Sequence, residues 1–257
     1  MNRLIGKEVS IGYGERVIVN NLDVAIPDGK ITSIIGPNGC GKSTLLKALS
    51  RLLNTKSGEI SLDGKNIHTQ STKEIAKKIA ILPQSPDVAD GLTAGELVSY
   101  GRFPHQKGFG RLNEEDKKEI DWAMRVTGSI DFKHRAVNDL SGGQRQRVWI
   151  AMALAQKTDI IFLDEPTTYL DISHQLEILE LVQELNAKHG TTIIMVLHDI
   201  NQAIRFSDHL IAMKNGDIVK QGETHEVLTN EILEKVFNID AELSLSLIHI
   251  SEPTRPL

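Results

Sequence analysis

The nonapeptide GPNGCGKST, residues 36–44, constrains this chain more than any other stretch of its sequence. An apolar run that ends at Ile35 precedes it, and apolar residues at helical spacing follow it from Leu45 onward. A strand, a glycine-rich turn and a helix in this order bind phosphate, because glycines let backbone amides approach phosphate oxygens. The amino terminus of the following helix adds unpaired amides and the positive end of its dipole. The pattern therefore predicts a nucleoside triphosphate site.

Every residue of this loop is a candidate contact for the nucleotide. Lys42 can reach the β- and γ-phosphates, and the Ser43 hydroxyl can hold a magnesium ion. A glycine-rich turn that only joins a strand to a helix is the structural alternative, but it does not require this full pattern between these flanks. The candidate contacts are Gly36, Pro37, Asn38, Gly39, Cys40, Gly41, Lys42, Ser43 and Thr44.

Composition narrows the class of protein that carries the loop. The 257 residues are 40% hydrophobic and 25% charged, which is typical of a globular protein. The net charge of −5 provides no overall basic field, so we expect no nucleic-acid partner. A single cysteine excludes an intramolecular disulfide, and no apolar run reaches the roughly 18 residues of a membrane-spanning helix. If the protein serves a membrane, another chain supplies the membrane-spanning part.

Apolar periodicity divides the chain into a core and an insertion. Continuous apolar runs such as 160–163 and 191–197 alternate with helical patterns, which is typical of parallel strands buried on both faces. Between residues 85 and 158 the strand signals vanish, and helical patterns broken by Gly and Pro replace them. We therefore expect an α/β fold: a P-loop NTPase with a mainly parallel core sheet, an antiparallel β-subdomain and an inserted α-helical subdomain.

Two carboxylates end the apolar run at 160–163. Asp164 and Glu165 follow it directly, and the carboxyl end of such a strand lies beside the triphosphate in a P-loop sheet. Phosphoryl transfer is catalysed mainly by positioning and by charge neutralisation. We expect Asp164 to hold magnesium through water and Glu165 to act as the general base for the attacking water. An ordinary acidic turn is the alternative, and the phosphate-binding loop elsewhere in the chain argues against it.

A second glycine-rich turn, LSGGQ at residues 140–144, also leads into a helix. Its amides and the Ser141 hydroxyl could form another anion site, although a capped helix start would explain the turn by itself. His198 directly follows the run at 191–197 and could hydrogen-bond a γ-phosphate oxygen, but a lone histidine at a strand end is more often structural. From local sequence alone, Tyr13 is expected to pack on the edge of a sheet.

The order of these motifs resembles that of the ATP-binding cassette ATPases. The motifs are GPNGCGKST, Gln84, LSGGQ, IIFLDEP, Leu170-Asp171 and His198, and the resemblance extends from Tyr13 to about residue 240. It implies a single cassette domain over residues 1–240. This domain would comprise a RecA-like core at about 1–84 and 159–240 and a helical subdomain at about 85–158.

The same resemblance implies roles that spacing alone does not show. Tyr13 becomes the aromatic ring that stacks on adenine, which reverses the local interpretation. Gln84 resembles a catalytic glutamine that also binds magnesium and links it to partner contacts. His198 takes its place beside the γ-phosphate, and Asp171 lies in a loop that communicates across a dimer.

The family works as head-to-tail homodimers with two ATP molecules between the subunits. The resemblance therefore implies that one subunit's Lys42 holds a γ-phosphate that the other subunit's LSGGQ turn contacts. ATP would keep such a dimer closed, and hydrolysis at Glu165 would let it open and drive a membrane permease. The contacts from the turn would be Ser141, Gly142, Gly143 and Gln144.

Two segments are similar to the importers of iron–siderophore, haem and cobalamin complexes: LTAGELV with GRFPH, residues 92–98 and 101–105, and TTYLDISHQ, residues 167–175. We expect iron–siderophore import, with the ATPase peripheral on the cytoplasmic face of the cell membrane. An extracellular or periplasmic substrate-binding protein would deliver the cargo.

A haem or cobalamin importer is one alternative to iron–siderophore import. Another is a non-transport cassette ATPase of translation or DNA repair, but those usually carry two cassettes or long coiled-coil arms.

Two features depart from the family pattern. Cys40 occupies a variable position of the loop, so we expect its thiol to lie close to bound phosphate, to react with thiol reagents and to be protected by ATP. Residues 244–257, SLSLIHISEPTRPL, do not resemble the family's end and look like non-native sequence, so we exclude them from the fold prediction.

Overall fold

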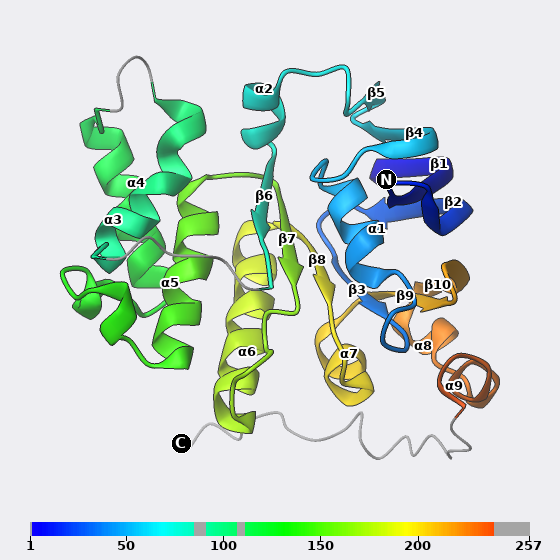
Figure 1. Cartoon of the computed structure of the whole chain (residues 1–257). Helices are drawn as coiled ribbons and strands as arrows, with labels where there is room; N and C mark the ends of the chain where they lie inside the picture. Colours follow the sequence, from blue (N-terminus) through cyan, green and yellow to red (C-terminus); the bar gives the residue numbers. More distant parts are fainter. Residues whose placement is uncertain (1, 85–90, 107–110, 239–257) are drawn as a thin grey trace.

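The computed structural model describes residues 2–84, 91–106 and 111–238, which form two sheets and the helices packed on them (Figure 1). The expected non-native tail at 244–257 lies outside the described residues. Within the described ranges, no helix combines the length and the apolar character needed to cross a bilayer.

The larger sheet is mainly parallel, which confirms the prediction from the continuous apolar runs. Its strand order is β10-β9-β3-β8-β7-β6, and β10 runs antiparallel to β9 while the other neighbours are parallel. Every residue of β3, β7 and β8 is buried, so these strands lack polar alternation. The strands are β3 (Ile31–Ile35), β6 (Ile79–Leu82), β7 (Ile160–Asp164), β8 (Thr192–Val196), β9 (His209–Lys214) and β10 (Asp217–Glu223).

The smaller sheet is antiparallel, with the strand order β2-β1-β4-β5. The helix α1 (Lys42–Leu49) packs between the two sheets, because its buried side chains share an apolar cluster with Ile60 of the smaller sheet and Phe162 of the larger one. The helix that follows the phosphate-binding loop therefore joins both sheets into one core. The strands are β1 (Asn2–Tyr13), β2 (Arg16–Pro27), β4 (Thr55–Leu62) and β5 (Lys65–Asn66).

Helices occupy the chain between β6 and β7 and form a separate body beside the larger sheet (Figure 1). Asn113 caps α4 through a reciprocal capping box with Asp116, and three acidic residues follow it in the first turn of the helix. The following apolar helix is buried against its neighbours through Val148, Trp149 and Ile150. The elements are α3 (Ala94–Ser99), η1 (Tyr100–His105), α4 (Glu114–Val126), η2 (Ile130–Phe132), η3 (Val137–Asp139) and α5 (Gly142–Ala155).

A tight turn and several shorter helices complete the described fold. The Asn215-Gly216 turn joins β9 to β10 with both residues at positive φ, which is typical of an Asn-Gly hairpin. The apolar pattern at helical spacing continues beyond Leu49, where α1 ends, and Arg51 then adopts a left-handed conformation with φ of 64°. The other helices are α2 (Thr72–Ala76), α6 (Ile172–His189), α7 (Ile200–Phe206), α8 (Thr224–Val227) and α9 (Asn230–Phe237).

Candidate functional site

The strand order of the larger sheet brings four sequence motifs to one edge. The strands β3, β8, β7 and β6 are successive neighbours and run parallel, so the residues that follow them emerge at the same edge. The phosphate-binding loop follows β3, His198 follows β8, Asp164 and Glu165 end β7, and Gln84 follows β6. Ligands of open α/β sheets bind at this carboxyl edge. Motifs far apart in the chain therefore share one site.

The phosphate-binding loop adopts a backbone that its glycines permit. Gly36, Gly39 and Gly41 have φ of 152°, 77° and 108°, in the left-handed half of conformational space. Lys42 is only 5% exposed, and its ammonium donates to the carbonyl oxygens of Gly36 and Pro37 at 2.9 and 3.0 Å. The loop thus surrounds its own lysine, and the same ammonium is available to a phosphate that enters the loop.

A contact between Ser43 and Asp164 ties the loop to β7. The Ser43 hydroxyl donates to the Asp164 Oδ1 atom at 2.8 Å. Burial raises the pKa of the Asp164 carboxyl, and the hydrogen bond from Ser43 acts in the opposite direction. A buried carboxylate with few partners favours a nearby cation, because the cation offsets the free-energy cost of leaving water.

Three side chains converge on the Glu165 carboxylate. Its Oε1 atom lies 2.6 Å from His198 Nε2, and its Oε2 atom accepts hydrogen bonds from Gln84 Nε2 and, at 3.1 Å, from Thr168 Oγ1. The backbone of Glu165 has φ of 54°, a conformation that non-glycine residues rarely adopt. Strain of this kind persists where surrounding contacts impose it, and the three donors are such contacts.

The LSGGQ turn lies on another part of the molecule. Ser141 is exposed and caps α5 by accepting from the Gln144 amide, while Gly142 and Gly143 form the first helical turn. The buried residues of α5 and of α1 belong to different apolar clusters, and the larger sheet separates the two helices in Figure 1. The structure of one chain therefore places this second candidate anion site away from α1.

Tyr13 and Asp171 both occupy exposed positions near strand or helix ends. Tyr13 is 49% exposed at the end of β1, opposite Arg16 of β2. Farther along β2, Ile18 and Val19 approach the Gly41 backbone, so this sheet edge borders the phosphate-binding loop. Asp171 caps α6 by accepting from the His174 amide.

The environment of Cys40 differs from that of a readily reactive thiol. The residue is 5% exposed and lies in the apolar cluster around α1, whereas the sequence suggested a thiol close to bound phosphate that thiol reagents can reach. A Cβ atom on Gly36 would lie 2.8 Å from the Cys40 sulfur, so the thiol packs behind the loop backbone. Burial raises the pKa of this thiol, although the nearby Lys42 charge acts in the opposite direction. The sequence could not reveal this, because the orientation of the residue depends on β2 and β9.

One residue of the site was missed by sequence reasoning. Thr168 lies three positions after Glu165 in the TTY segment, and its hydroxyl reaches the Glu165 carboxylate. Its amide also donates to the Glu165 carbonyl oxygen at 3.2 Å. A hydroxyl residue three positions after a carboxylate was the available signal, since such residues commonly bond back to their own turn.

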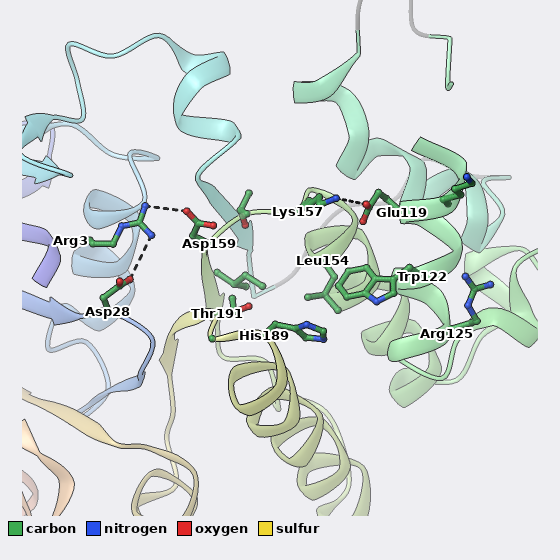
Figure 2. A pocket seen from close by; sticks show the side chains of 14 residues that line it. Arg3, Asp28, Glu119, Trp122, Arg125, Leu154, Lys157, Asp159, His189 and Thr191 are labelled. Atoms are coloured by element: carbon green, nitrogen blue, oxygen red, sulfur yellow. Dashed lines mark hydrogen bonds and ion pairs between the residues drawn. The ribbon is translucent and has the colours of Figure 1, made fainter. Parts of the chain in front are cut away.

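A cavity of about 830 Å³ lies at a different place, between α4 and the start of β7 and β8 (Figure 2). Trp122 lines it from α4, while Asp159 and Thr191 line it from the residues that precede the two strands. Arg3 forms ion pairs with Asp159 at 3.1 Å and with Asp28 at 3.7 Å along one wall. Because Asp159 and Thr191 precede their strands, this cavity lies at the amino edge of the sheet, opposite the candidate site.

Comparison with known proteins points to one family. The ABC transporter family matches residues 19–168. The iron(3+)-hydroxamate import ATP-binding protein FhuC of Bacillus subtilis (strain 168) is 59% identical over 243 residues, which cover 95% of this chain and 90% of that protein. The ferric enterobactin transport ATP-binding protein FepC of Escherichia coli (strain K12) is 50% identical over 237 residues, which cover 92% of this chain and 88% of that protein.

Solved structures are similar over the same extent. A metal-chelate type ABC transporter in an inward-facing conformation gives a TM-score of 0.81 at 28% identity, over 92% of this chain and 89% of that chain. A dimeric bacterial ABC transporter cassette gives a TM-score of 0.76 at 32% identity, over 86% of this chain and 98% of that chain. These similarities identify the same family as the phosphate-binding loop and the carboxylates at the end of β7. The chain is an ATP-binding protein of the ABC transporter family.

Proposed function

We propose that this chain hydrolyses ATP to power the uptake of iron–siderophore complexes through a separate membrane permease. The 59% identity to an iron(3+)-hydroxamate import ATP-binding protein over 95% of the chain carries this proposal. The carboxylate cluster beside the phosphate-binding loop supports it, since hydrolysis needs a base next to the nucleotide. In this proposal the ATPase is peripheral on the cytoplasmic side of the cell membrane, and a substrate-binding protein delivers the cargo to the permease.

In the proposed site, Lys42 and the amides of the loop bind the β- and γ-phosphates. Lys42 would exchange the carbonyl oxygens of Gly36 and Pro37 for phosphate oxygens, which are better partners for an ammonium. Tyr13 would stack on the adenine, because it pairs with Arg16 of β2 and β2 borders the phosphate-binding loop. These contacts bind and orient the nucleotide and leave the chemistry to the edge of β7.

Glu165 is the proposed general base. Its carboxylate lies where β7 ends, and its contacts with His198 and Thr168 restrict its orientation. A carboxylate that is fixed in this way can accept a proton from a water that is aligned with the γ-phosphate. His198, whose side chain is 43% exposed beside this carboxylate, would hydrogen-bond a γ-phosphate oxygen.

The residues present fit a magnesium ion. Ser43 and Asp164 offer two oxygen atoms 2.8 Å apart, and the burial that raises the Asp164 pKa favours a cation beside it. Gln84 donates its amide nitrogen to Glu165, so its amide oxygen is the atom that would bind the ion. Among the described residues no group of three or more His, Cys, Asp or Glu side chains forms a metal cage. This suits magnesium, which commonly uses one or two protein ligands together with phosphates and water. When bound, the ion would neutralise charge that develops on the phosphates.

The proposed active form is a homodimer. Each chain has one phosphate-binding loop at the carboxyl edge of its sheet, and its LSGGQ turn exposes Ser141 and Gly142 on another part of the surface. A second candidate anion site in the same chain is explained if the LSGGQ turn of one subunit completes the nucleotide site of the other. Ser141, Gly142, Gly143 and Gln144 would then contact ATP in trans, and Asp171 would lie close to the interface.

Growth on a defined iron source tests the transport function. A strain that lacks this gene should fail to grow when a ferric hydroxamate siderophore is its only iron source, and the wild-type gene should restore growth. A gene with Glu165→Gln should not restore it, because the permease would lack its energy source. Normal growth of the deletion strain on all ferric siderophores, with defects on haem or cobalamin, would contradict siderophore import and support the alternative cargo. Co-purification with ribosomes or DNA, without a membrane protein, would contradict transport altogether.

A further inference from the structure

The imidazole of His174 is fixed on one edge by the amino-terminal cap of α6. Its Nδ1 atom lies 2.7 Å from Asp171 Oδ1, and the same oxygen accepts from the His174 amide at 2.9 Å. The bond from this amide is the main reason that the pKa of Asp171 falls to about 2. The ring is 42% exposed, yet these contacts restrict its orientation.

The opposite edge of the ring lies against Gly143 of the LSGGQ turn. A Cβ atom on Gly143 would lie 2.5 Å from His174 Cδ2, closer than real Cβ contacts allow, and 3.1 Å from Cγ, which is unusually tight. Gly143 is buried, and it does not have a positive φ angle that would by itself require glycine. The close approach of the two helices at this point therefore depends on the absence of a side chain at residue 143.

Neighbouring contacts continue this interface between α5 and α6. Leu170 Cδ2 lies 3.5 Å from the position of a Cβ atom on Gly142. One helical turn farther along, Arg147 forms an ion pair with Glu177 at 2.7 Å. This ion pair links α5 to α6 beyond the first helical turn, whereas His174 contacts the glycine turn at the start of α5.

The segment before His174 leads back to the proposed general base. Thr168 bonds to Glu165 through both its amide and its hydroxyl, and the Leu170 amide donates to the Thr167 carbonyl oxygen at 3.3 Å. This compact loop ends at Asp171, the partner of the imidazole. One short run of bonded residues thus connects Glu165 with the ring that contacts Gly143.

We propose that His174 is a positioning residue for ATP hydrolysis, because its imidazole sets the LSGGQ turn relative to the loop that carries Glu165 in the same subunit. The inference rests on the proposed function, in which this turn contacts the nucleotide of the other subunit. In this proposal His174 acts through Asp171 and Gly143, without a contact of its own to either nucleotide. It fixes the relative geometry of the two parts of its subunit that serve different ATP molecules.

A thermal double-mutant cycle tests the contact without relying on activity. Alanine is a better helix former than glycine, so Gly143→Ala should raise the melting temperature wherever space is available. With His174 present, the clash reverses this sign, and Gly143→Ala should lower the melting temperature. In a His174→Ala background the same change should be neutral or stabilising. Additive effects, with the same sign in both backgrounds, would show that the ring does not restrict residue 143.

Kinetics then test the positioning role. His174→Ala should lower kcat about tenfold or more, as expected for misplaced groups, while binding of a fluorescent ATP analogue to the monomer changes less than about twofold. His174→Asn can place amide atoms at the positions of Nδ1 and Cδ2, so it should recover most of the activity. His225→Ala is the matched control, because His225 also lies beside a carboxylate, Glu223 at 3.6 Å, and is exposed on α8.

The outcomes separate this inference from the proposed function. If wild type and His225→Ala hydrolyse ATP and His174→Ala is equally active, the positioning role is wrong while the ATPase function stands. If His174→Asn is as impaired as His174→Ala, the imidazole does not act through the two edges described. A wild-type chain without ATPase activity would contradict the proposed function itself, and the thermal cycle would still report on the contact between His174 and Gly143.

Discussion

His198 Nε2 lies 2.6 Å from Glu165 Oε1, although the two residues are 33 positions apart in the chain. The contact exists because β7 and β8 are parallel neighbours, so the residues that follow them meet at the same edge. Gln84 and Thr168 bond to the other carboxylate oxygen. The proposed base is thus oriented by residues from three separate segments, and each contact can be removed individually.

The substitution Glu165→Gln should lower kcat by about 100- to 10,000-fold, because the amide has the shape of the carboxylate but cannot accept the proton of water. ATP binding should persist, and the variant should accumulate as an ATP-bound dimer in size-exclusion chromatography. Phosphate release measures the rate, and Glu184→Gln, which is exposed on α6, is the control. Turnover at the wild-type rate would remove Glu165 from the role of base.

Two alanine substitutions in the phosphate-binding loop should differ widely in their effects on stability. A Cβ atom on Gly36 would lie 2.2 Å from the Met213 carbonyl oxygen, whereas one on Gly39 would meet nothing within 4 Å. Gly39→Ala should therefore cost about 1 kcal/mol, from its left-handed backbone alone. Gly36→Ala adds a backbone clash and should cost more than about 3 kcal/mol. Urea unfolding measures both, and equal losses would show that Met213 does not restrict Gly36.

The Cys40 thiol should react slowly with a thiol reagent in the native protein and rapidly after unfolding. Burial both blocks access and raises the pKa of the thiol, and the thiolate is the reactive form. Bound ATP should slow the reaction further by stabilising the folded state. The time course of labelling with and without denaturant measures this. Rapid labelling of the native chain would instead support the reactive thiol beside the phosphates that the sequence suggested.

The ion pairs of Asp63 predict a pH-dependent contribution to stability. The hydrogen bond from Arg3, supported by Lys78, lowers the Asp63 pKa from 3.8 to about 2. Because the Asp63 pKa is lower in the folded state, the ionised carboxylate stabilises the fold at pH values above its unfolded-state pKa. This contribution is lost as the pH falls through the folded-state pKa. Because the side chains are about one-third exposed, Asp63→Asn should cost about 1 kcal/mol at pH 7.

Urea unfolding between pH 7 and pH 3 checks this sign. The difference in unfolding free energy between wild type and Asp63→Asn should be constant down to about pH 4 and then shrink. Asp217→Asn is a suitable control, since Asp217 is exposed beside the hairpin turn. A difference that grows as the pH falls would contradict the ion-pair assignment.

Local sequence was sufficient where local sterics and hydrogen bonding decide the structure. Glycines allow the positive φ angles of the phosphate-binding loop, and Asn113 and Ser141 cap the helices that follow them. Continuous apolar runs marked β7 and β8 as strands buried on both faces. The order of the motifs further indicated the family, which the comparisons confirm.

The tertiary structure decided what depends on partners distant in the chain. Strand order placed His198 and Gln84 on Glu165, and packing between the sheets buried Cys40. The contact of His174 with Gly143 likewise exists only because α5 and α6 pack together. Sequence periodicity reports which face of an element is apolar, but it carries no information on which element covers that face. The sequence by itself thus determined the loop that binds phosphate, and only the fold determined which side chains surround it.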